Sequence, residues 1–408
     1  MKILHTSDWH LGKKLGDFDR AEEQIEVLQE ICDIAESEKV DAVIIAGDLF
    51  DTFNPPTQAV ELFYKALKKL TKNGTRAVIA IAGNHDSPDR IEAPDPLARE
   101  CGIIFAGYPN SESTPFELES GLKVLNRSPG FIELKIPDCQ APLRLLLTPY
   151  ANEMRLKTAL ANDNTDEELN HILQQKWQEL ANNNCDEKGI NLLVSHLFFV
   201  RKGAVLPEEP DDEKPILNIG GAQAIHTENI PEQIQYTALG HLHRMQQVDK
   251  RPCPVYYSGS PLSYSFAESN QEKYVLVVDL EPAKKPVLKE IELTKGKKLF
   301  RKRFETIDLA IQWLESNPDC FVELTMVTDK YITAQDQKLL RNSHKGIVTI
   351  IPELLDTENQ EQENRKIIDL TKSLEQQFAV YFFHVKKQEP NEELMSLFRE
   401  VIGVQDNQ

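Results

Sequence analysis

Short apolar runs alternate with amphipathic stretches along the first half of the chain. The run from Ala42 to Ala46 is entirely apolar, which is typical of a strand buried on both faces. From Arg20 to Ser37 a helix with one buried face is predicted, because apolar residues recur at three- and four-residue spacing: Ile25, Leu28, Cys32 and Ala35. A predicted helix at 57–72 and a strand at 77–82 repeat this unit. The alternation predicts a layered α/β domain.

Three further predicted strands run directly into loops that carry histidine. They span Lys2–Leu4, Asn191–Ser195 and Tyr236–Leu239. In α/β sheets, ligands gather beyond the carboxyl ends of the strands. Every polar cluster of this part of the chain follows such an end, so we expect the clusters to form one site.

A smaller second domain is predicted after residue 280, where Pro282 and Pro286 interrupt a strand-like run. The pattern beyond indicates an α+β domain over 281–387, with strands at 321–327 and 347–351 and helices at 306–314 and 367–378. The last segment, 388–408, contains an amphipathic helix near 392–401 that either packs on the body or binds a partner. The acidic, proline-rich stretch 202–218 predicts an exposed loop.

Length and composition agree with a globular chain of two domains. With 408 residues and 40% hydrophobic content, the chain can bury a large core. It contains no run of about 18 apolar residues and starts without the features of a secretory signal, so we expect a cytoplasmic protein. Six cysteines without paired spacing favour reduced thiols over a zinc ribbon or a disulfide framework.

The net charge of −19 opposes simple electrostatic attraction to a polyanion such as DNA. It therefore counts against a stand-alone DNA-binding module. The charge counts less against a nuclease, because bound divalent metal ions reverse the local field and a basic partner subunit can supply further phosphate contacts.

Five short motifs carry the candidate chemistry: Asp8-Trp9-His10, Gly47–Asp51, Gly83–Asp86, Ser195-His196 and Gly240–His243. Carboxylate and amide oxygens mixed with imidazoles suit manganese, iron or zinc, and a shared carboxylate can bridge two such ions about 4 Å apart. A pair of ions serves phosphate-ester hydrolysis, since it lowers the pKa of water and stabilises charge on the phosphoryl oxygens.

In this order, the motifs D-x-H, G-D-x-x-D, G-N-H-D, a strand-end histidine and G-H-x-H resemble the signature of the calcineurin-like phosphoesterase superfamily. The resemblance implies a four-layer α/β/β/α domain over 1–280, with the second region as a capping domain, and two divalent metal ions. The first ion would be held by Asp8, His10 and His243, the second by Asn84, His196 and His241, and Asp48 would bridge them. His85 would be the catalytic histidine, which stabilises the transition state or protonates the leaving alkoxide.

Asp51 is the second aspartate of the G-D-x-x-D motif. The resemblance implies a catalytic role in which Asp51 orients His85 and stabilises its charge. Archaeal and eukaryotic break-repair relatives carry histidine at the matching place, whereas SbcD-like proteins carry aspartate. Asp51 also fits a plain loop cap in Asp51-Thr52-Phe53, and both interpretations stay open.

The flanking segments resemble the SbcD family of bacterial nucleases. The stretches ILHTSDWHLGK, AGDLFDTFNPP, YTALGHLHRMQ and YYSGSPLSYSF carry the likeness, which is close over residues 1–278. It implies a Mn(II)-dependent 3'-5' exonuclease on double-strand DNA ends, and a single-strand and hairpin endonuclease, in DNA replication, recombination and repair at the nucleoid.

The same resemblance implies partners for this chain besides DNA. An SbcC-type coiled-coil ATPase would bind it, with the C-terminal helix docking on the coiled coil. Two copies of the chain would form a homodimer within a heterotetramer, joined by helices at 57–72 and 89–99. Residues 281–387 would orient DNA over the metal ions.

Two other functions are compatible with parts of the sequence. One is a metallophosphoesterase for small phosphomonoesters or cyclic nucleotides, which a second domain of about 100 residues disfavours. The other is a non-catalytic scaffold with the same fold, which the complete set of candidate ligands disfavours.

Two features keep alternative interpretations. Six basic residues gather at the start of the second domain: Lys295, Lys297, Lys298, Arg301, Lys302 and Arg303. They form either a solvated face or a phosphate contact. Ser260, in the segment YSGSP, lies either in a plain turn or in a loop that touches substrate.

Overall fold

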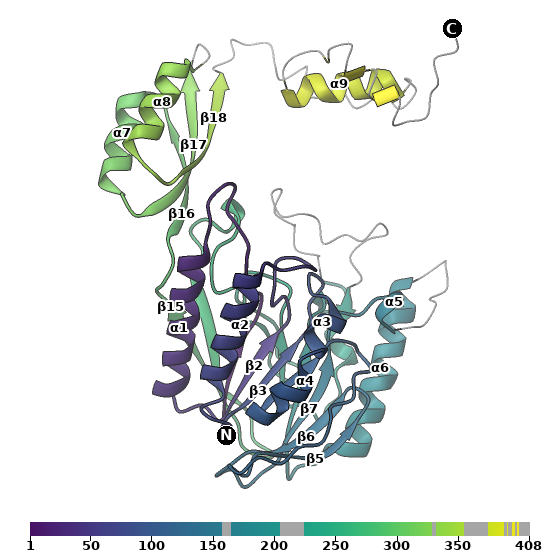
Figure 1. The fold of residues 1–408 in the computed structure, drawn as a ribbon. Helices are drawn as coiled ribbons and strands as arrows, with labels where there is room; N and C mark the ends of the chain where they lie inside the picture. The colour runs from purple at the N-terminus through teal and green to yellow at the C-terminus, as the bar shows by residue number, and fades with distance from the viewer. Residues whose placement is uncertain are drawn as a thin grey trace.

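The computed structural model describes residues 1–156, 165–204, 224–328, 332–354 and 374–386, together with 390, 394–395 and 398–399. Two β-sheets pack face to face in the larger domain, and helices cover their outer faces (Figure 1). The order of layers is helix, sheet, sheet, helix. This arrangement confirms the four-layer α/β/β/α fold.

The first sheet has six strands in the order β15-β14-β1-β2-β3-β4. Its strands are β1 (Lys2–Thr6), β2 (Ala42–Ala46), β3 (Ala77–Ile81), β4 (Ile103–Ala106), β14 (Lys273–Asp279) and β15 (Val287–Leu293). β1 to β4 run parallel, and β14 is antiparallel to β1 and β15. All residues of β2 and β3 are buried, because the sheet is covered on both faces.

The second sheet has seven strands in the order β12-β13-β11-β8-β7-β6-β5. They are β5 (Lys123–Ser128), β6 (Phe131–Lys135), β7 (Leu143–Thr148), β8 (Ile190–Ser195), β11 (Tyr236–Leu239), β12 (Gln246–Asp249) and β13 (Val255–Tyr257). The central strands β7, β8, β11 and β13 run parallel. A separate pair is formed by β9 (Phe199–Val200) and β10 (Ile225–His226).

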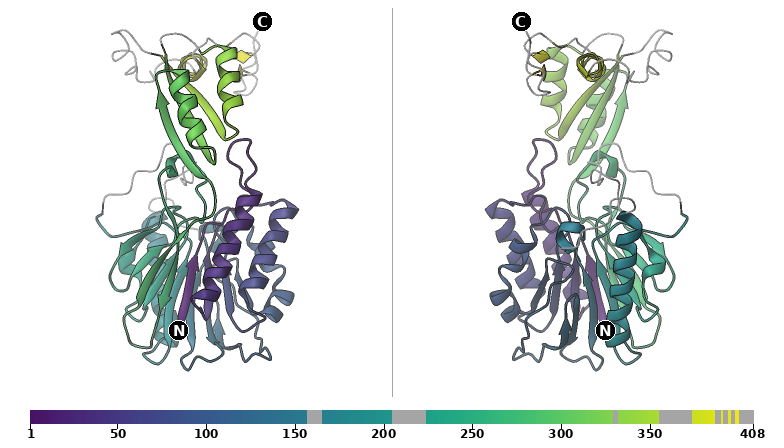
Figure 2. Two further views of the ribbon diagram at one scale, coloured as in Figure 1. Left: turned by 90° about the vertical axis from the view of Figure 1, so that its left-hand side faces the viewer. Right: turned by 90° about the vertical axis from the view of Figure 1, so that its right-hand side faces the viewer.

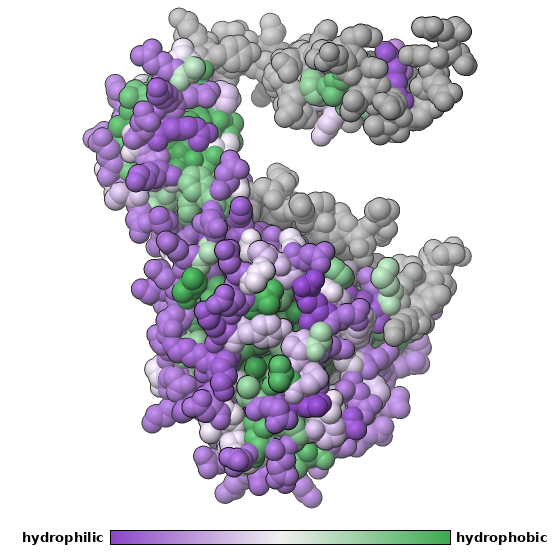
Figure 3. All heavy atoms as spheres, viewed as in Figure 1, coloured by the Kyte–Doolittle hydropathy of each residue, from purple (hydrophilic) through white to green (hydrophobic). Residues whose placement is uncertain are grey.

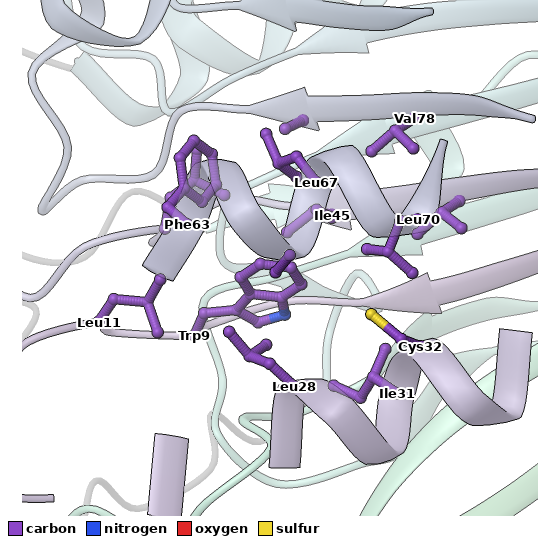
Figure 4. Packing of buried hydrophobic residues seen from close by; sticks show 14 of the residues in the cluster. Trp9, Leu11, Leu28, Ile31, Cys32, Ile45, Phe63, Leu67, Leu70 and Val78 are labelled. Atoms are coloured by element: carbon purple, nitrogen blue, oxygen red, sulfur yellow. The ribbon is translucent and has the colours of Figure 1, made fainter. Parts of the chain in front are cut away.

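Helices α1 (Ala21–Ser37) and α2 (Thr57–Leu70) cover the first sheet, near the short α3 (Pro88–Glu92), α4 (Asp95–Ala98) and η1 (Arg99–Cys101) (Figure 2). The second sheet is covered by α6 (Thr165–Asn184), which α5 (Glu153–Leu156) precedes. Trp9, from the first motif, is fully buried in the core around α1 and α2, with its ring centroid 6.2 Å from that of Phe63 (Figure 4). The fold thus anchors the loop that carries Asp8 and His10.

The buried face of α1 differs from the predicted one at its first turn. Ile25 is 53% exposed, and Gln24 is buried in its place. The Gln24 amide donates to the carbonyl oxygen of His10 at 3.1 Å and accepts from the N–H of Gly12 at 3.1 Å. A polar residue is buried there because the helix meets the backbone of a candidate ligand loop.

The second domain alternates strands and helices: β16 (Lys298–Phe304), α7 (Ile307–Ser316), β17 (Cys320–Thr328), α8 (Ala334–Ser343) and β18 (Ile347–Leu354). The three strands are parallel, in the order β16-β17-β18. Its own core includes Leu314, Leu324 and Leu340. The predicted mixture of helices and strands is present, and its alternation produces a parallel sheet.

Several expectations about segments change or fall outside the described residues. β15 lies beyond the predicted boundary at 280 but pairs with β14, so Pro282 and Pro286 lie in the connection of a hairpin rather than in a linker. Prolines 94 and 96 divide the expected helix at 89–99 into α3 and α4. The expected helix at 367–378 overlaps α9 (Leu374–Lys386) over its last five residues, and 367–373 lie outside the described residues. Most of the loop at 202–218 and of the helix at 392–401 lies outside the described residues.

The face shown in Figure 3 is mainly hydrophilic over both domains. Within the described ranges, the helices are all too short or too polar to cross a membrane.

Candidate metal centre

The loops after β1, β2, β3, β8 and β11 carry all of the predicted site residues: Asp8, His10, Asp48, Asp51, Asn84, His85, His196, His241 and His243. Three overlapping groups place their ligand atoms within 4.8 Å of one another: Asp8, His10 and His243; His10, Asp51 and His85; and Asp8, Asp48 and His196. Both sheets contribute residues to the site, and they meet there because β2 of the first sheet contacts β8 and β11 of the second.

The loops hold four of these residues in strained backbone conformations. Asp8, His10, Asp48 and His241 have positive φ angles of 52°, 43°, 48° and 115°. Residues other than glycine rarely adopt this region, and such strain persists where surrounding contacts over-determine it, as at functional sites. All four side chains are also buried. The strained backbone therefore lowers the stability of the fold, and it holds these side chains in place.

Two motif glycines allow the loops to approach one another. A Cβ atom on Gly47, which has a φ of +91°, would overlap the ring of His196. A Cβ atom on Gly83 would overlap the carboxylate of Asp48. A larger residue at either position would displace a candidate ligand from another loop.

The first group of candidate ligands faces inward from the loops after β1 and β11. Nε2 of His10 lies 3.0 Å from Nε2 of His243. The Asp8 carboxylate accepts from the N–H of His241 at 3.0 and 3.2 Å and from the hydroxyl of Ser7 at 2.5 Å. Of two ring nitrogens that face one another, only one can keep a proton, whereas a shared cation accommodates both lone pairs.

The second group centres on the amide oxygen of Asn84, which lies 3.0 Å from Nε2 of His196 and 3.1 Å from Nδ1 of His241. Asp48 lies between the two groups. Its Oδ2 is 3.6 Å from Nε2 of His10 and 3.4 Å from Nε2 of His196. One carboxylate oxygen therefore reaches a histidine of each group.

Spacing and tautomers both fit metal binding. Two ligands bound at right angles about 2.1 Å from one ion lie about 3.0 Å apart, and the donors in the two groups are 3.0 and 3.1 Å apart. Nδ1 of His196 donates to the carbonyl oxygen of Ala46 at 2.7 Å, and Nδ1 of His243 contacts the Glu268 carboxylate at 3.3 Å. Because these oxygens only accept, Nδ1 of each histidine carries a proton, and Nε2 is the nitrogen left to bind a cation once its own proton has been displaced.

Comparison with known proteins agrees with this geometry. The sequence profile of the calcineurin-like phosphoesterases matches residues 1–245, which include every candidate ligand. The chain is also 33% identical to the SbcD component of nuclease SbcCD from Bacillus subtilis, over 100% of this chain and 99% of that protein. The chain belongs to the SbcD group of the calcineurin-like phosphoesterase family.

Two other proteins are also similar to this phosphoesterase. The SbcD component of nuclease SbcCD from Rhodobacter capsulatus is 31% identical over 69% of this chain and 66% of its own length. Among solved structures, a dimetal phosphatase from Danio rerio is similar at 12% identity and a TM-score of 0.38, covering 72% of this chain and 99% of that chain.

Burial and neighbouring charges shift the pKa values of the phosphoesterase site in different directions. Burial raises the pKa of Asp8 to about 6 and lowers that of His241 to about 3. At Asp48 burial is opposed and outweighed by the charge of His196, which holds the pKa of the carboxyl well below its usual range. The pKa of His196 rises to about 9, since Asp48 outweighs the effect of burial there. A cation that occupies the site must therefore replace the proton of His196.

His85 and Asp51 meet through the backbone. Nδ1 of His85 donates to the carbonyl oxygen of Asp51 at 2.8 Å, and the N–H of His85 donates to Oδ1 of Asp48 at 2.9 Å. The Asp51 carboxylate instead binds Nζ of Lys13 at 3.0 Å and lies 3.7 Å from Nδ1 of His10. Asp51 is thus placed to orient His85 through its main-chain carbonyl, whereas its carboxylate faces Lys13 and His10.

Asp86, which ends the G-N-H-D motif, received no role from the sequence. Its fully buried carboxylate accepts from the N–H groups of Gly83 and Leu49 at 2.8 and 3.0 Å on Oδ2, and from that of Phe50 at 3.0 Å on Oδ1. Arg155 donates to the carbonyl oxygens of Gly83 and Asp86 at 2.7 and 2.8 Å. Asp86 therefore ties together the loops after β2 and β3. The only indication of this role in the sequence is the position of Asp86 at the end of the G-N-H-D motif.

The two features left open by the sequence have structural partners. The Ser260 hydroxyl is buried and hydrogen-bonds to the Leu262 carbonyl at 2.8 Å and to Nζ of Lys273 at 3.0 Å, which favours a structural turn. Within the basic run, ion pairs join Lys297 to Asp319 at 3.2 Å, Arg301 to Glu323 at 2.8 Å and Arg303 to Glu353 at 2.9 Å. This pairing favours the solvated face.

Proposed function

We propose that this phosphoesterase hydrolyses phosphodiester bonds of DNA with two divalent metal ions, most consistently Mn(II). Asp8, His10 and His243 hold one ion, and Asn84, His196 and His241 hold the other. The observation that carries the proposal is the position of Asp48, whose Oδ2 lies 3.6 Å from His10 and 3.4 Å from His196. Two ions in such a site, when bound, activate water and stabilise charge on the phosphoryl oxygens.

His85 supplies the proton that the leaving oxygen requires. Its Nδ1–H is committed to the carbonyl oxygen of Asp51 at 2.8 Å, so the ring would donate from Nε2 in its doubly protonated form and keep the Nδ1 proton as a neutral imidazole. Asp48 holds the loop of His85 in place, because its Oδ1 accepts from the N–H of His85 at 2.9 Å. Asp51 thereby acts on catalysis by orienting the ring, and its carboxylate holds Lys13 near the site.

The chain is a nuclease subunit that acts on double-strand DNA ends and hairpins, as a 3'-5' exonuclease and a single-strand endonuclease in end processing. Its likeness to the SbcD component of nuclease SbcCD over the full length of both chains supports this assignment. An SbcC-type coiled-coil ATPase binds two copies of the chain in a heterotetramer at the nucleoid. The net charge of −19 favours such a partner, because the chain alone offers little attraction to DNA.

Cleavage of an end-labelled DNA hairpin in Mn(II) tests the proposal, with a small phosphodiester and a phosphomonoester assayed in parallel. The wild type should cleave the hairpin, and His85→Gln should lose most of that activity. His171→Gln is the matched control, because His171 is exposed and contacts Gln175 rather than the site. Turnover of the small esters alone, even with the ATPase added, would instead assign a phosphatase or cyclic-nucleotide esterase.

A further inference from the structure

The two proposed metal positions differ in which parts of the chain support them. The second position is supported within the first domain, because His196 donates to Ala46 at the end of β2. The first position borders the segment from Leu262 to Glu268, which follows the second sheet and leads into β14. That segment contacts the second domain.

Glu268 is the direct link between this segment and the first metal position. Its carboxylate, 1% exposed, contacts Nδ1 of His243 at 3.3 Å through Oε1. The same oxygen accepts from the N–H groups of Tyr264 and Ser265 at 2.9 and 3.1 Å and thus caps the 3-10 turn η3 (Phe266–Glu268). Any displacement of η3 therefore moves the carboxylate that orients His243.

Two further contacts make this link stiff. Lys273 forms an ion pair with Glu268 and donates to the carbonyl oxygen of His243 at 3.0 Å. The ring of Tyr264 lies 5.6 Å from that of His10, edge to face, and its hydroxyl donates to the carbonyl oxygen of Trp9. Both imidazoles of the first position thus touch residues 264–268 or their partner.

The second domain packs directly on the same segment. An interdomain cluster joins Leu15 and Phe266 of the first domain to Leu299 and Phe321 of the second, and all four are at least 93% buried. Phe266 is two residues before Glu268, and Leu15 is five residues after His10. Beside this cluster, the Glu23 carboxylate accepts from the N–H of Lys297 at 2.6 Å.

We propose that docking of the second domain positions Glu268 and thereby sets the geometry of one metal site, that of Asp8, His10 and His243. Glu268 is a positioning residue in this account. The second metal site, that of Asn84, His196 and His241, is independent of docking. The second domain then controls occupancy of a single ion, and any partner or DNA that shifts this domain changes that ion's affinity. The inference rests on the proposed metal ligands.

The test is a calorimetric titration of the full chain with Mn(II), which resolves two binding steps, for Leu299→Ala and for Leu324→Ala as a matched control. Leu324 is equally buried in the second domain but belongs to that domain's own core. Leu299→Ala should weaken one step at least tenfold and leave the other within twofold, whereas Leu324→Ala should change neither step by more than twofold. Equal effects of the two variants, or equal weakening of both steps, would overturn the proposal.

Two further variants identify the affected site. Glu268→Gln keeps the shape of the side chain and should weaken the same step as Leu299→Ala. In a His243→Ala background, which retains only the second site, Leu299→Ala should have no further effect, and a further loss there would refute the assignment. Circular dichroism checks folding, and Leu299→Val replaces the alanine variant if that variant unfolds. A wild type that binds no ions would reject the proposed function itself, whereas two tight ions without dependence on Leu299 would reject only this inference.

Discussion

The Asp86→Asn substitution is a sensitive test of how the site is held together. The Asp86 carboxylate accepts three backbone N–H bonds, two on Oδ2 and one on Oδ1. An asparagine can keep two of them with its single oxygen, but its amide group then faces the N–H of Phe50, donor against donor. The N–H of Phe50, a residue that is 3% exposed, loses its partner, at a cost of about 1–3 kcal/mol.

The loss of charge adds nothing to this cost, because burial and the nearby charge of Asp48 already raise the pKa of Asp86 to about 6. The unpaired N–H alone predicts a loss of about 1–3 kcal/mol in the free energy of unfolding of the metal-free protein. The loops after β2 and β3 separate as a result, so both metal ions should bind more weakly.

Urea unfolding followed by circular dichroism and by tryptophan fluorescence measures this loss, and coincident transitions establish the two-state analysis. Asp33→Asn is the matched control, because the Asp33 side chain is 66% exposed and should change stability by less than about 0.5 kcal/mol. A loss at Asp86→Asn no larger than that of the control would refute the role assigned to the buried carboxylate.

Three further predictions concern the metal centre and DNA. His85→Gln should keep two bound ions but lower turnover about 10²–10⁴-fold, whereas Asp48→Asn should disrupt the binding of both ions. Calorimetry measures the number of bound ions in each variant. Loss of both ions in His85→Gln would contradict the assignment. Mn(II) at 100 times its Kd should stabilise the wild type by about 2.7 kcal/mol per ion in urea unfolding, and Asp48→Asn should remove this gain. Charge reversal at Lys297, Arg301 and Arg303 should leave the salt dependence of DNA binding unchanged, since all three are paired with acids; a shallower salt slope would indicate phosphate contacts instead.

The convergence of the ligand loops was predictable because each motif follows a predicted strand. β2 has the predicted bounds, Ala42–Ala46, since an all-apolar run of this length suits a strand buried on both faces. Parallel strands bring their carboxyl ends to one edge, so the order of motifs along the chain became a cluster in space. Gly47 and Gly83 allow the loops to converge, because the absence of a side chain at each leaves room for a candidate ligand from another loop.

The supporting residues were beyond the sequence because their partners are set by tertiary packing. Glu268 lies 25 residues from His243, and the pattern Ser265-x-x-Glu268 indicates only a capped turn. The pairing of β15 with β14 was beyond the sequence for a similar reason. Pro282 and Pro286 are compatible with a linker or with a hairpin, and only the pairing of β14 with β15 distinguishes the two.

The most direct test of the two-metal account is anomalous scattering at the manganese edge from crystals of the full chain grown with Mn(II). The account predicts two peaks, one bound by Asp8, His10 and His243 and one by Asn84, His196 and His241, with a carboxylate oxygen of Asp48 shared between them. A single peak, or two peaks without a shared Asp48 oxygen, would contradict it.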